Sequence, residues 1–184
     1  FLEKKGIRHI FGVTGGGAMH LNDGIQYNVG STLIPEVTNC NFTGNTSTFV
    51  GGAIAIVAIN PVIDSCGITN NNATGDLDFQ ACGPEYQGGA GIYTWDSTAT
   101  IENCTITSNQ TSYGSGAGIY SSGTISGYVP EISNTNITNN YSASNGGGIA
   151  VNSYPVSGDI YTANTWQMNI TNCNVSSNVA DGNG

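Results

Sequence analysis

Few side chains in this sequence can act as a base, a nucleophile or a cation. The chain has 184 residues, of which only three are Lys or Arg and two are His. All five fall in the first 20 residues, as Lys4, Lys5, Arg8, His9 and His20. The rest of the chain therefore lacks a base for a Ser or Cys nucleophile, a catalytic lysine and a histidine for a metal. It also lacks the cations that neutralise nucleic-acid phosphates.

Acidic residues offer the chemistry that remains. The chain has 12 Asp or Glu residues and a formal net charge of −9, and the densest group is Asp76, Asp78 and Glu85, with Asp64 or Asp96 nearby. Carboxylate oxygens on a loop suit Ca²⁺, so this group is either a calcium site or a solvated acidic loop. We expect no other cofactor. Paired carboxylates can also catalyse glycoside hydrolysis with inversion. A polysaccharide lyase that uses an Arg or Lys base is disfavoured, because the chain has no Lys or Arg after Arg8.

A short repeat organises most of the chain. Five copies align without gaps: an aliphatic residue, Cys or Thr three residues later, an apolar residue two further on, and Asn three after that. A glycine block such as Gly116-Ala117-Gly118-Ile119 follows each of the first four copies. Longer spacings come from insertions, chiefly residues 72–87 and 153–166. The recurring positions are Cys40, Cys66, Cys104, Thr135 and Cys173, and Asn45, Asn71, Asn109, Asn140 and Asn178.

The repeat predicts short strands. Apolar residues alternate with a period of two between Gly and Asn residues, which indicates strands of about three to five residues joined by tight turns. A small polar residue such as Asn103 precedes each Cys or Thr and tolerates a left-handed turn. Each repeat is then one coil of an all-β parallel β-helix, a solenoid of about five to six coils spaced about 4.8 Å apart. Stacked Cys, Ile and Val fill its interior, and stacked Asn side chains bond along its axis.

One copy carries a family resemblance. Asn103-Cys104-Thr105-Ile106-Thr107-Ser108-Asn109, followed by Gly116-Ala117-Gly118-Ile119-Tyr120, resembles the repeats of polymorphic outer-membrane-type proteins. More broadly, it resembles the right-handed parallel β-helix of pectin-lyase-like proteins. The resemblance covers about residues 31–184. It implies the fold and leaves the activity open, because this architecture hosts lyases, hydrolases, adhesins and structural fibres.

The start of the chain departs from the repeat. Residues 1–25 resemble the opening of thiamine-diphosphate-dependent enzymes of the acetolactate-synthase type, but the glutamate that activates that cofactor has no counterpart here. Gly16-Gly17-Ala18-Met19 also aligns with the glycine block Gly51-Gly52-Ala53-Ile54. Residues 1–30 are therefore an atypical N-terminal segment, either a first partial coil or a foreign graft. Residues 31–184 form the β-helix, which we expect to continue past residue 184 in a longer chain or a neighbouring copy.

The cysteines and the glycosylation sequons occupy defined places in the repeat. We expect the four Cys residues of the repeat to form a buried thiol ladder. Disulfides from Cys66 to Cys40 or to Cys82 remain as alternatives. The chain has nine Asn-x-Ser/Thr sequons, and an acceptor for N-glycosylation must face outward. The best outward candidates are Asn41, Asn72, Asn136 and Asn174.

Composition favours an extracellular or cell-surface protein, since the chain is rich in Gly, Asn, Ser and Thr and poor in Lys and Arg. No apolar run is long enough to insert in a membrane. We expect a structural or adhesive segment, a glycoprotein that self-associates into a filament or binds glycans, without nucleic acid. The alternative is a carbohydrate-active hydrolase or lyase. Ice binding is disfavoured because the outward Thr residues form no regular Thr-x-Thr array.

Overall fold

The computed structural model describes residues 34–74, 88–123, 128–153 and 167–182. These residues form 19 strands and no helix, and the strands pair only in parallel in four sheets. None of the described residues belongs to a helix of the length and apolarity needed to cross a membrane. The predicted all-β parallel β-helix is confirmed. The N-terminal segment, residues 1–30, lies outside the described residues.

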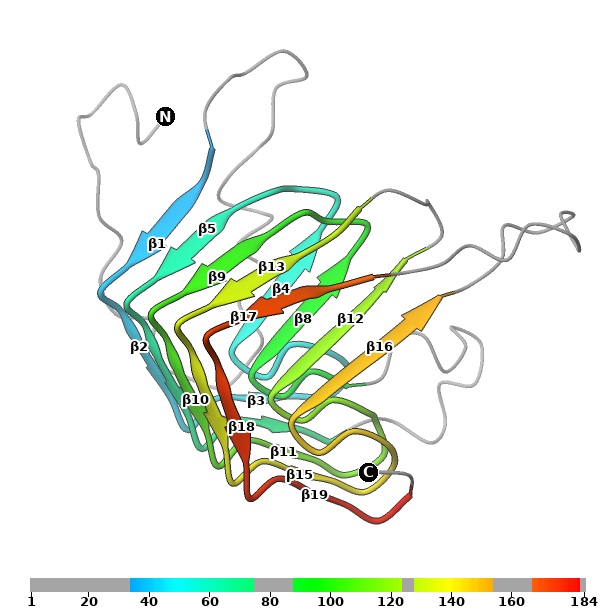
Figure 1. The fold of residues 1–184 in the computed structure, drawn as a ribbon. Helices are drawn as coiled ribbons and strands as arrows, with labels where there is room; N and C mark the ends of the chain where they lie inside the picture. The colour runs from blue at the N-terminus through cyan, green and yellow to red at the C-terminus, as the bar shows by residue number, and fades with distance from the viewer. Residues whose placement is uncertain (1–33, 75–87, 124–127, 154–166, 183–184) are drawn as a thin grey trace, which may run out of the picture.

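The four sheets, named A to D here, run side by side along the helix axis (Figure 1). Sheet A contains β1 (Glu36–Thr38), β5 (Val62–Asp64), β9 (Thr100–Glu102), β13 (Glu131–Ser133) and β17 (Asn169–Thr171). Sheet B contains β2 (Asn41–Thr43), β6 (Gly67–Thr69), β10 (Thr105–Thr107), β14 (Asn136–Thr138) and β18 (Asn174–Ser176). Sheet C contains β3 (Thr46–Ser47), β7 (Asn72–Ala73), β11 (Gln110–Thr111), β15 (Tyr141–Ser142) and β19 (Val179–Ala180). Sheet D contains β4 (Ile54–Val57), β8 (Ile92–Trp95), β12 (Ile119–Gly123) and β16 (Ile149–Ser153).

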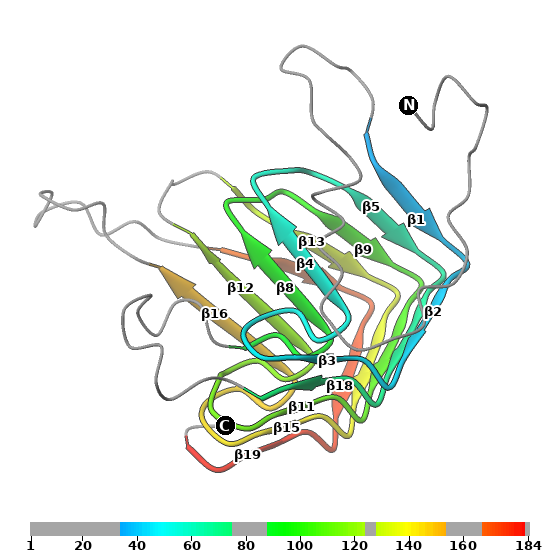
Figure 2. The same cartoon turned by 180° about the vertical axis from the view of Figure 1, so that it is seen from behind.

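Each coil visits sheets A, B, C and D in that order, and the fifth described coil contributes β17, β18 and β19. Figure 2 shows the strands of sheet D side by side from the opposite direction. Equivalent residues in successive coils are separated by 26, 38, 31 and 38 residues along the chain. The strands keep their register despite these unequal lengths, so the additional residues are accommodated between strands.

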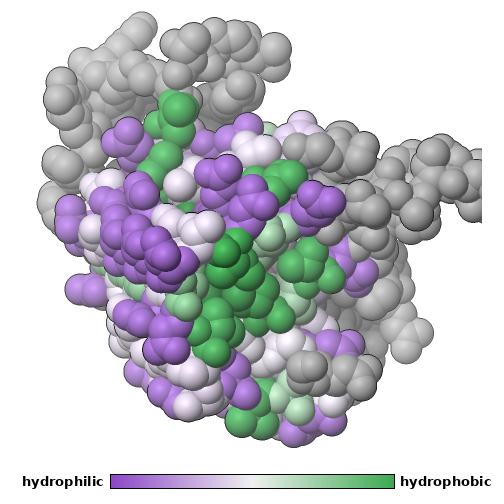
Figure 3. Space-filling view, viewed as in Figure 1, coloured by the Kyte–Doolittle hydropathy of each residue, from purple (hydrophilic) through white to green (hydrophobic). Residues whose placement is uncertain are grey.

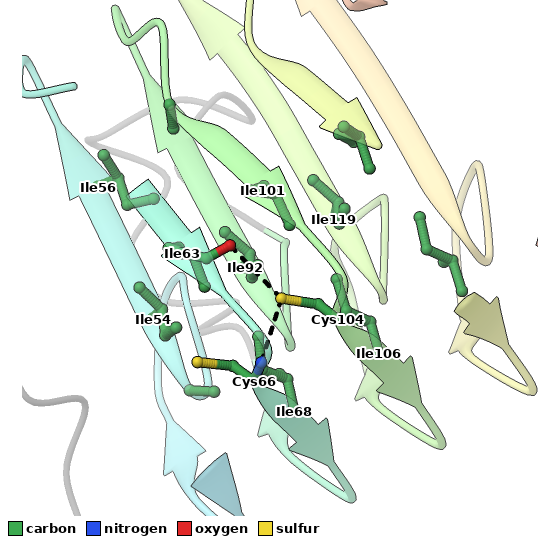
Figure 4. Close-up of a cluster of buried hydrophobic side chains, with 14 residues drawn as sticks. Ile54, Ile56, Ile63, Cys66, Ile68, Ile92, Ile101, Cys104, Ile106 and Ile119 are labelled. Carbon is green, nitrogen blue, oxygen red and sulfur yellow. Dashed lines mark hydrogen bonds between the residues drawn. The ribbon is translucent and has the colours of Figure 1, made fainter. Parts of the chain in front are cut away.

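The core is a column of isoleucines along the axis (Figure 4). In the strands of sheets A and B the middle residue points inward and its two neighbours point outward. Successive coils therefore stack Ile63 on Ile101 and Ile68 on Ile106. In sheet D the inward column runs from Ile54 to Ile149 through two fully buried residues, Ile92 and Ile119. β-branched side chains suit such a ladder because they pack well on a pleated surface.

The corners between sheets use left-handed residues. The residue between sheets A and B has positive φ in every described coil, as predicted for these small polar residues: Asn39, Ser65, Asn103, Asn134 and Asn172. The corner between sheets B and C is built the same way, from Gly44, Asn70, Ser108, Asn139 and Ser177. Gly, Asn and Ser dominate these positions because left-handed backbone is least costly for glycine and for short polar side chains.

The glycine blocks bring neighbouring coils into close approach at the entry to sheet D. A Cβ atom on Gly118 would lie 2.5 Å from the carbonyl oxygen of Gly148 in the next coil. A Cβ on Gly52 would lie 2.5 Å from the carbonyl oxygen of Ala90. These contacts are with backbone, which cannot rotate away, so a larger residue would clash at Gly118 and at Gly52.

The sequence pattern misplaced one boundary. The spacing predicts an insertion over residues 72–87, but Asn72 and Ala73 form β7, which pairs with β3 and β11. The strands of sheet C have only two residues each. Two residues are too few to show a period of two, so the pattern did not reveal this sheet.

Candidate binding surfaces

The cysteines of the repeat lie in one column at the corner between sheets A and B. The backbone N–H of Cys40 donates to Sγ of Cys66 over 3.4 Å. The N–H of Cys66 donates to Sγ of Cys104, also over 3.4 Å (Figure 4). The N–H of Cys104 donates to Oγ1 of Thr135 over 3.2 Å. The side chains of Cys66, Cys104 and Thr135 thus each accept a hydrogen bond from the backbone N–H of the equivalent residue one coil earlier. The hydroxyl of Thr replaces the thiol because both can accept this hydrogen bond.

The four cysteines of this column are free thiols. Cys66 and Cys104 are 2% and 1% exposed. A side-chain hydrogen bond with Cys104 lowers the pKa of Cys66 to about 7, although burial opposes the shift. The same bond, with burial, raises the pKa of Cys104. Burial raises the pKa of Cys40, and the neighbouring Cys66 adds to the shift. Cys82 lies outside the described residues.

The asparagines of the repeat form a second column at the corner between sheets B and C. Oδ1 of Asn109 accepts the backbone N–H of Asn71 at 3.0 Å and its side-chain Nδ2 at 2.9 Å. Nδ2 of Asn109 donates in turn to Oδ1 of Asn140 and to the carbonyl of Ile68. The same bonds link Asn45 to Asn71 and Asn140 to Asn178. Every described coil is therefore joined to the next by buried or half-buried hydrogen bonds of the Asn side-chain amides.

The outer face of sheet B carries an unbroken column of hydroxyl groups. Thr43 and Thr69 share a hydrogen bond of 3.0 Å between their Oγ1 atoms, and Thr138 donates to Thr107 over 3.2 Å. Strand pairing places the five members of this hydroxyl column in register: Thr43, Thr69, Thr107, Thr138 and Ser176. The parallel outward column is mixed, since it contains Asn41, Gly67, Thr105, Asn136 and Asn174. Among the described strands of sheet B only β10 therefore has Thr at both outward positions.

Three of the four candidate glycosylation sites share this face. Asn41, Asn136 and Asn174 are exposed, and each lies two residues before a member of the hydroxyl column. Asn136 and Asn174 are direct neighbours across β14 and β18. The fourth candidate, Asn72, is only partly exposed in β7, and its Oδ1 is buried without a hydrogen-bond partner.

Acidic residues gather instead on the outer face of sheet A. Asp64 of β5 lies directly opposite Glu102 of β9. Asp64 accepts hydrogen bonds from Nδ2 of Asn103 at 2.7 Å and from Oγ of Ser65 at 3.0 Å. Because parallel strands lie about 4.8 Å apart, the two carboxylates are close neighbours. Insertions of unequal length conceal this pair in the sequence, but the constant offset of two residues before each Cys would have revealed it.

The predicted calcium ligands are not part of the described molecule, since Asp76, Asp78 and Glu85 all fall within residues 75–87. Within the described ranges, no group of three or more His, Cys, Asp or Glu side chains is arranged to hold a metal ion.

The end of the stack formed by β17, β18 and β19 exposes apolar side chains. Ile170 and Val175 occupy inward positions but are 44% and 48% exposed. Their equivalents one coil earlier, Ile132 and Ile137, are 1% and 0% exposed. Figure 3 shows this apolar surface in the middle of the end face. The core column is therefore open to solvent at this end.

Comparison with known proteins adds no family assignment. No family model matches the chain, and no curated protein or solved structure matches it.

Proposed function

We propose that this chain is a non-catalytic structural and adhesive segment of a secreted or cell-surface β-helix protein. We further propose that it belongs with the pectin-lyase-like β-helices and the polymorphic outer-membrane-type repeats. The observation that carries the proposal is the hydroxyl column of sheet B. It presents evenly spaced, uncharged hydrogen-bonding groups on a rigid face that spans all five described coils.

The chemistry of this face suits a neutral polysaccharide. Hydroxyl and amide groups both donate and accept hydrogen bonds, as sugar hydroxyls do. No acidic side chain lies on the described strands of sheet B, and the chain has no Lys or Arg after Arg8. Affinity must therefore come from many weak, repeated contacts, which is the mode of an adhesin rather than of an enzyme pocket.

Adsorption to insoluble neutral polysaccharides, such as cellulose, chitin and xylan, tests the proposal. We expect the protein to be depleted from solution by at least one of them. Thr107→Lys, in the middle of the hydroxyl column, should reduce the bound fraction about tenfold. Thr100→Lys adds the same charge in the same coil but on sheet A, so it should bind as wild type does. Absence of adsorption, or equal loss in both variants, would contradict an adhesive sheet B.

The Asp64 and Glu102 pair supports a second candidate function, a carbohydrate-active enzyme. The two residues lie opposite each other on strands spaced about 4.8 Å apart. This spacing is closer to the carboxyl separation of a retaining hydrolase than to that of the inverting type expected from the sequence. Release of reducing sugar that disappears in both Asp64→Asn and Glu102→Gln would favour this candidate. Equal product with or without either substitution would exclude the pair as catalytic groups.

A further inference from the structure

We propose that this chain stacks head to tail on a second copy of itself. The C-terminal face, formed by β17, β18 and β19, would pair with the N-terminal face of the next copy, formed by β1, β2 and β3. The proposal rests on the structural role proposed above and specifies its partner. It is carried by the open strand edges, the direction of the two side-chain ladders and the apolar column.

The strand edges are the first argument. In sheets A, B and C the described strands β5 to β15 pair on both sides, whereas the strands of the two faces pair with a described strand on one side only. Natural proteins protect such edges with Lys, Pro or bulges. The strands of the C-terminal face read Asn-Ile-Thr, Asn-Val-Ser and Val-Ala, with no charge and no Pro. This edge is therefore open to pairing with another strand.

The ladders have a direction, which makes the two faces complementary. At the corner between sheets B and C the backbone N–H of each of the first four coils donates to a side chain of the coil that follows it. At the corner between sheets A and B the first three coils do the same. Among the described residues, the N–H groups of Cys173 and Asn178 consequently have no acceptor. At the other end, Sγ of Cys40 and Oδ1 of Asn45 accept no such bond from any residue that the structure describes. Cys173 and Asn178 are five residues apart in the chain, as are Cys40 and Asn45. A single alignment of the two faces would therefore join Cys173 to Cys40 and Asn178 to Asn45.

The apolar column and the charges are compatible with this register. Ile170 would stack on Val37, and Val175 on Phe42. Both contacts continue inward columns whose middle members are buried: Ile63, Ile101 and Ile132 in one, and Ile68, Ile106 and Ile137 in the other. Glu36, the acidic residue of β1, would face the uncharged Asn169. No two like charges on the paired strands are brought opposite each other, so electrostatics do not oppose the contact.

Sedimentation velocity of the 184-residue protein across a concentration series tests the proposal. We expect the average mass to rise with concentration and to exceed that of a dimer, because a head-to-tail dimer still has one free face at each end. Val175→Lys should abolish assembly. Thr100→Lys is the matched control, since it adds the same charge on β9 in the third coil, away from both faces, and it should assemble as wild type does. A wild-type protein that remains monomeric up to about 100 μM would overturn the proposal.

A mixing experiment establishes the polarity. Val175→Lys blocks the C-terminal face and Phe42→Lys blocks the N-terminal face, so each variant alone should be monomeric. An equimolar mixture should form dimers only, because each partner contributes one intact face. Dimers of either variant alone would contradict the head-to-tail contact.

Circular dichroism checks that both variants are folded. If one variant is not folded, the concentration series of the wild-type protein decides whether the copies assemble. Polysaccharide adsorption by Val175→Lys is read separately, so loss of assembly and loss of adhesion are distinguishable.

Discussion

The backbone N–H of Asn71 donates to Oδ1 of Asn109, one coil further along the axis, over 3.0 Å. This bond occupies a corner where the chain leaves one sheet for the next, so the side chain supplies the acceptor that a neighbouring strand would provide within a sheet. Asn109 is fully buried and takes part in bonds to three other residues: Asn71, Asn140 and Ile68. The stability of the stack should depend strongly on such residues.

Replacing Asn109 by Ala should lower the free energy of unfolding by about 3 kcal/mol, because several buried polar groups lose their partners. Gln110→Ala, one residue later on an exposed outward position, should change it by less than about 0.5 kcal/mol. Urea denaturation followed by circular dichroism measures both values. Equal effects of the two substitutions would show that the Asn column does not hold the coils together.

The thiol column should accept Thr better than Ala. Thr135 already fills this column and accepts the N–H of Cys104. We therefore expect Cys104→Thr to cost less than about 1.5 kcal/mol, whereas Cys104→Ala should cost about 2 to 3 kcal/mol because it removes the acceptor and leaves a void. Thermal and urea unfolding compare the two variants. A Thr variant less stable than the Ala variant would contradict the role assigned to this column.

Stability should rise between pH 7 and pH 9 because of Cys66. Its pKa in the folded protein is about 7, below the ordinary value of 9.0. Its thiolate therefore stabilises the fold fully above the ordinary pKa, and this contribution is lost as the pH falls through about 7. The raised pKa of Cys104 acts in the opposite sense, above its ordinary value of 9.0. Urea midpoints at pH 7 and 9 should differ in wild type but not in Cys66→Thr. The same difference between the two pH values in both proteins would exclude Cys66 as the source of the pH dependence.

Tyr141 and Asp181 connect coils four and five on the outer surface. The Tyr141 hydroxyl donates to Oδ2 of Asp181, and this bond raises the pKa of the tyrosine. Its stabilising contribution is therefore present below the ordinary tyrosine pKa and is lost as the pH rises through the raised value. In absorbance titrations at alkaline pH, Asp181→Asn should return Tyr141 toward its ordinary pKa, with Tyr141→Phe as the reference. If the pKa of Tyr141 is the same in Asp181→Asn as in wild type, this assignment is refuted.

The sequence predicted those parts of the fold in which the same residue type recurs at the equivalent position of each coil. Cys and Asn at fixed offsets marked two corners, and Ile alternation marked sheets A, B and D. The strands of sheet C escaped detection because they have two residues each, and Asn72 was assigned to an insertion for the same reason. Positive φ at Asn103 and its equivalents followed directly from residue type.

The candidate surfaces were harder to foresee. The hydroxyl column contains one hydroxyl residue per coil, so it forms no Thr-x-Thr array along the sequence. It recurs three residues after every Cys or Thr of the repeat: Thr43, Thr69, Thr107, Thr138 and Ser176. The complementarity of the two faces depends on which coil donates and which accepts. That direction is a property of the backbone geometry at the corner, and no residue type encodes it.

Residue-resolved amide hydrogen exchange on dilute protein tests most directly the claim that side-chain ladders join the coils. The backbone N–H groups of Asn71 and Asn109 should exchange at least about 100-fold more slowly than that of Asn178, because only the first two donate to a side chain of the following coil. At concentrations where the copies stack, Asn178 should become protected as well. Equal exchange of Asn71, Asn109 and Asn178 in the dilute protein would contradict the account.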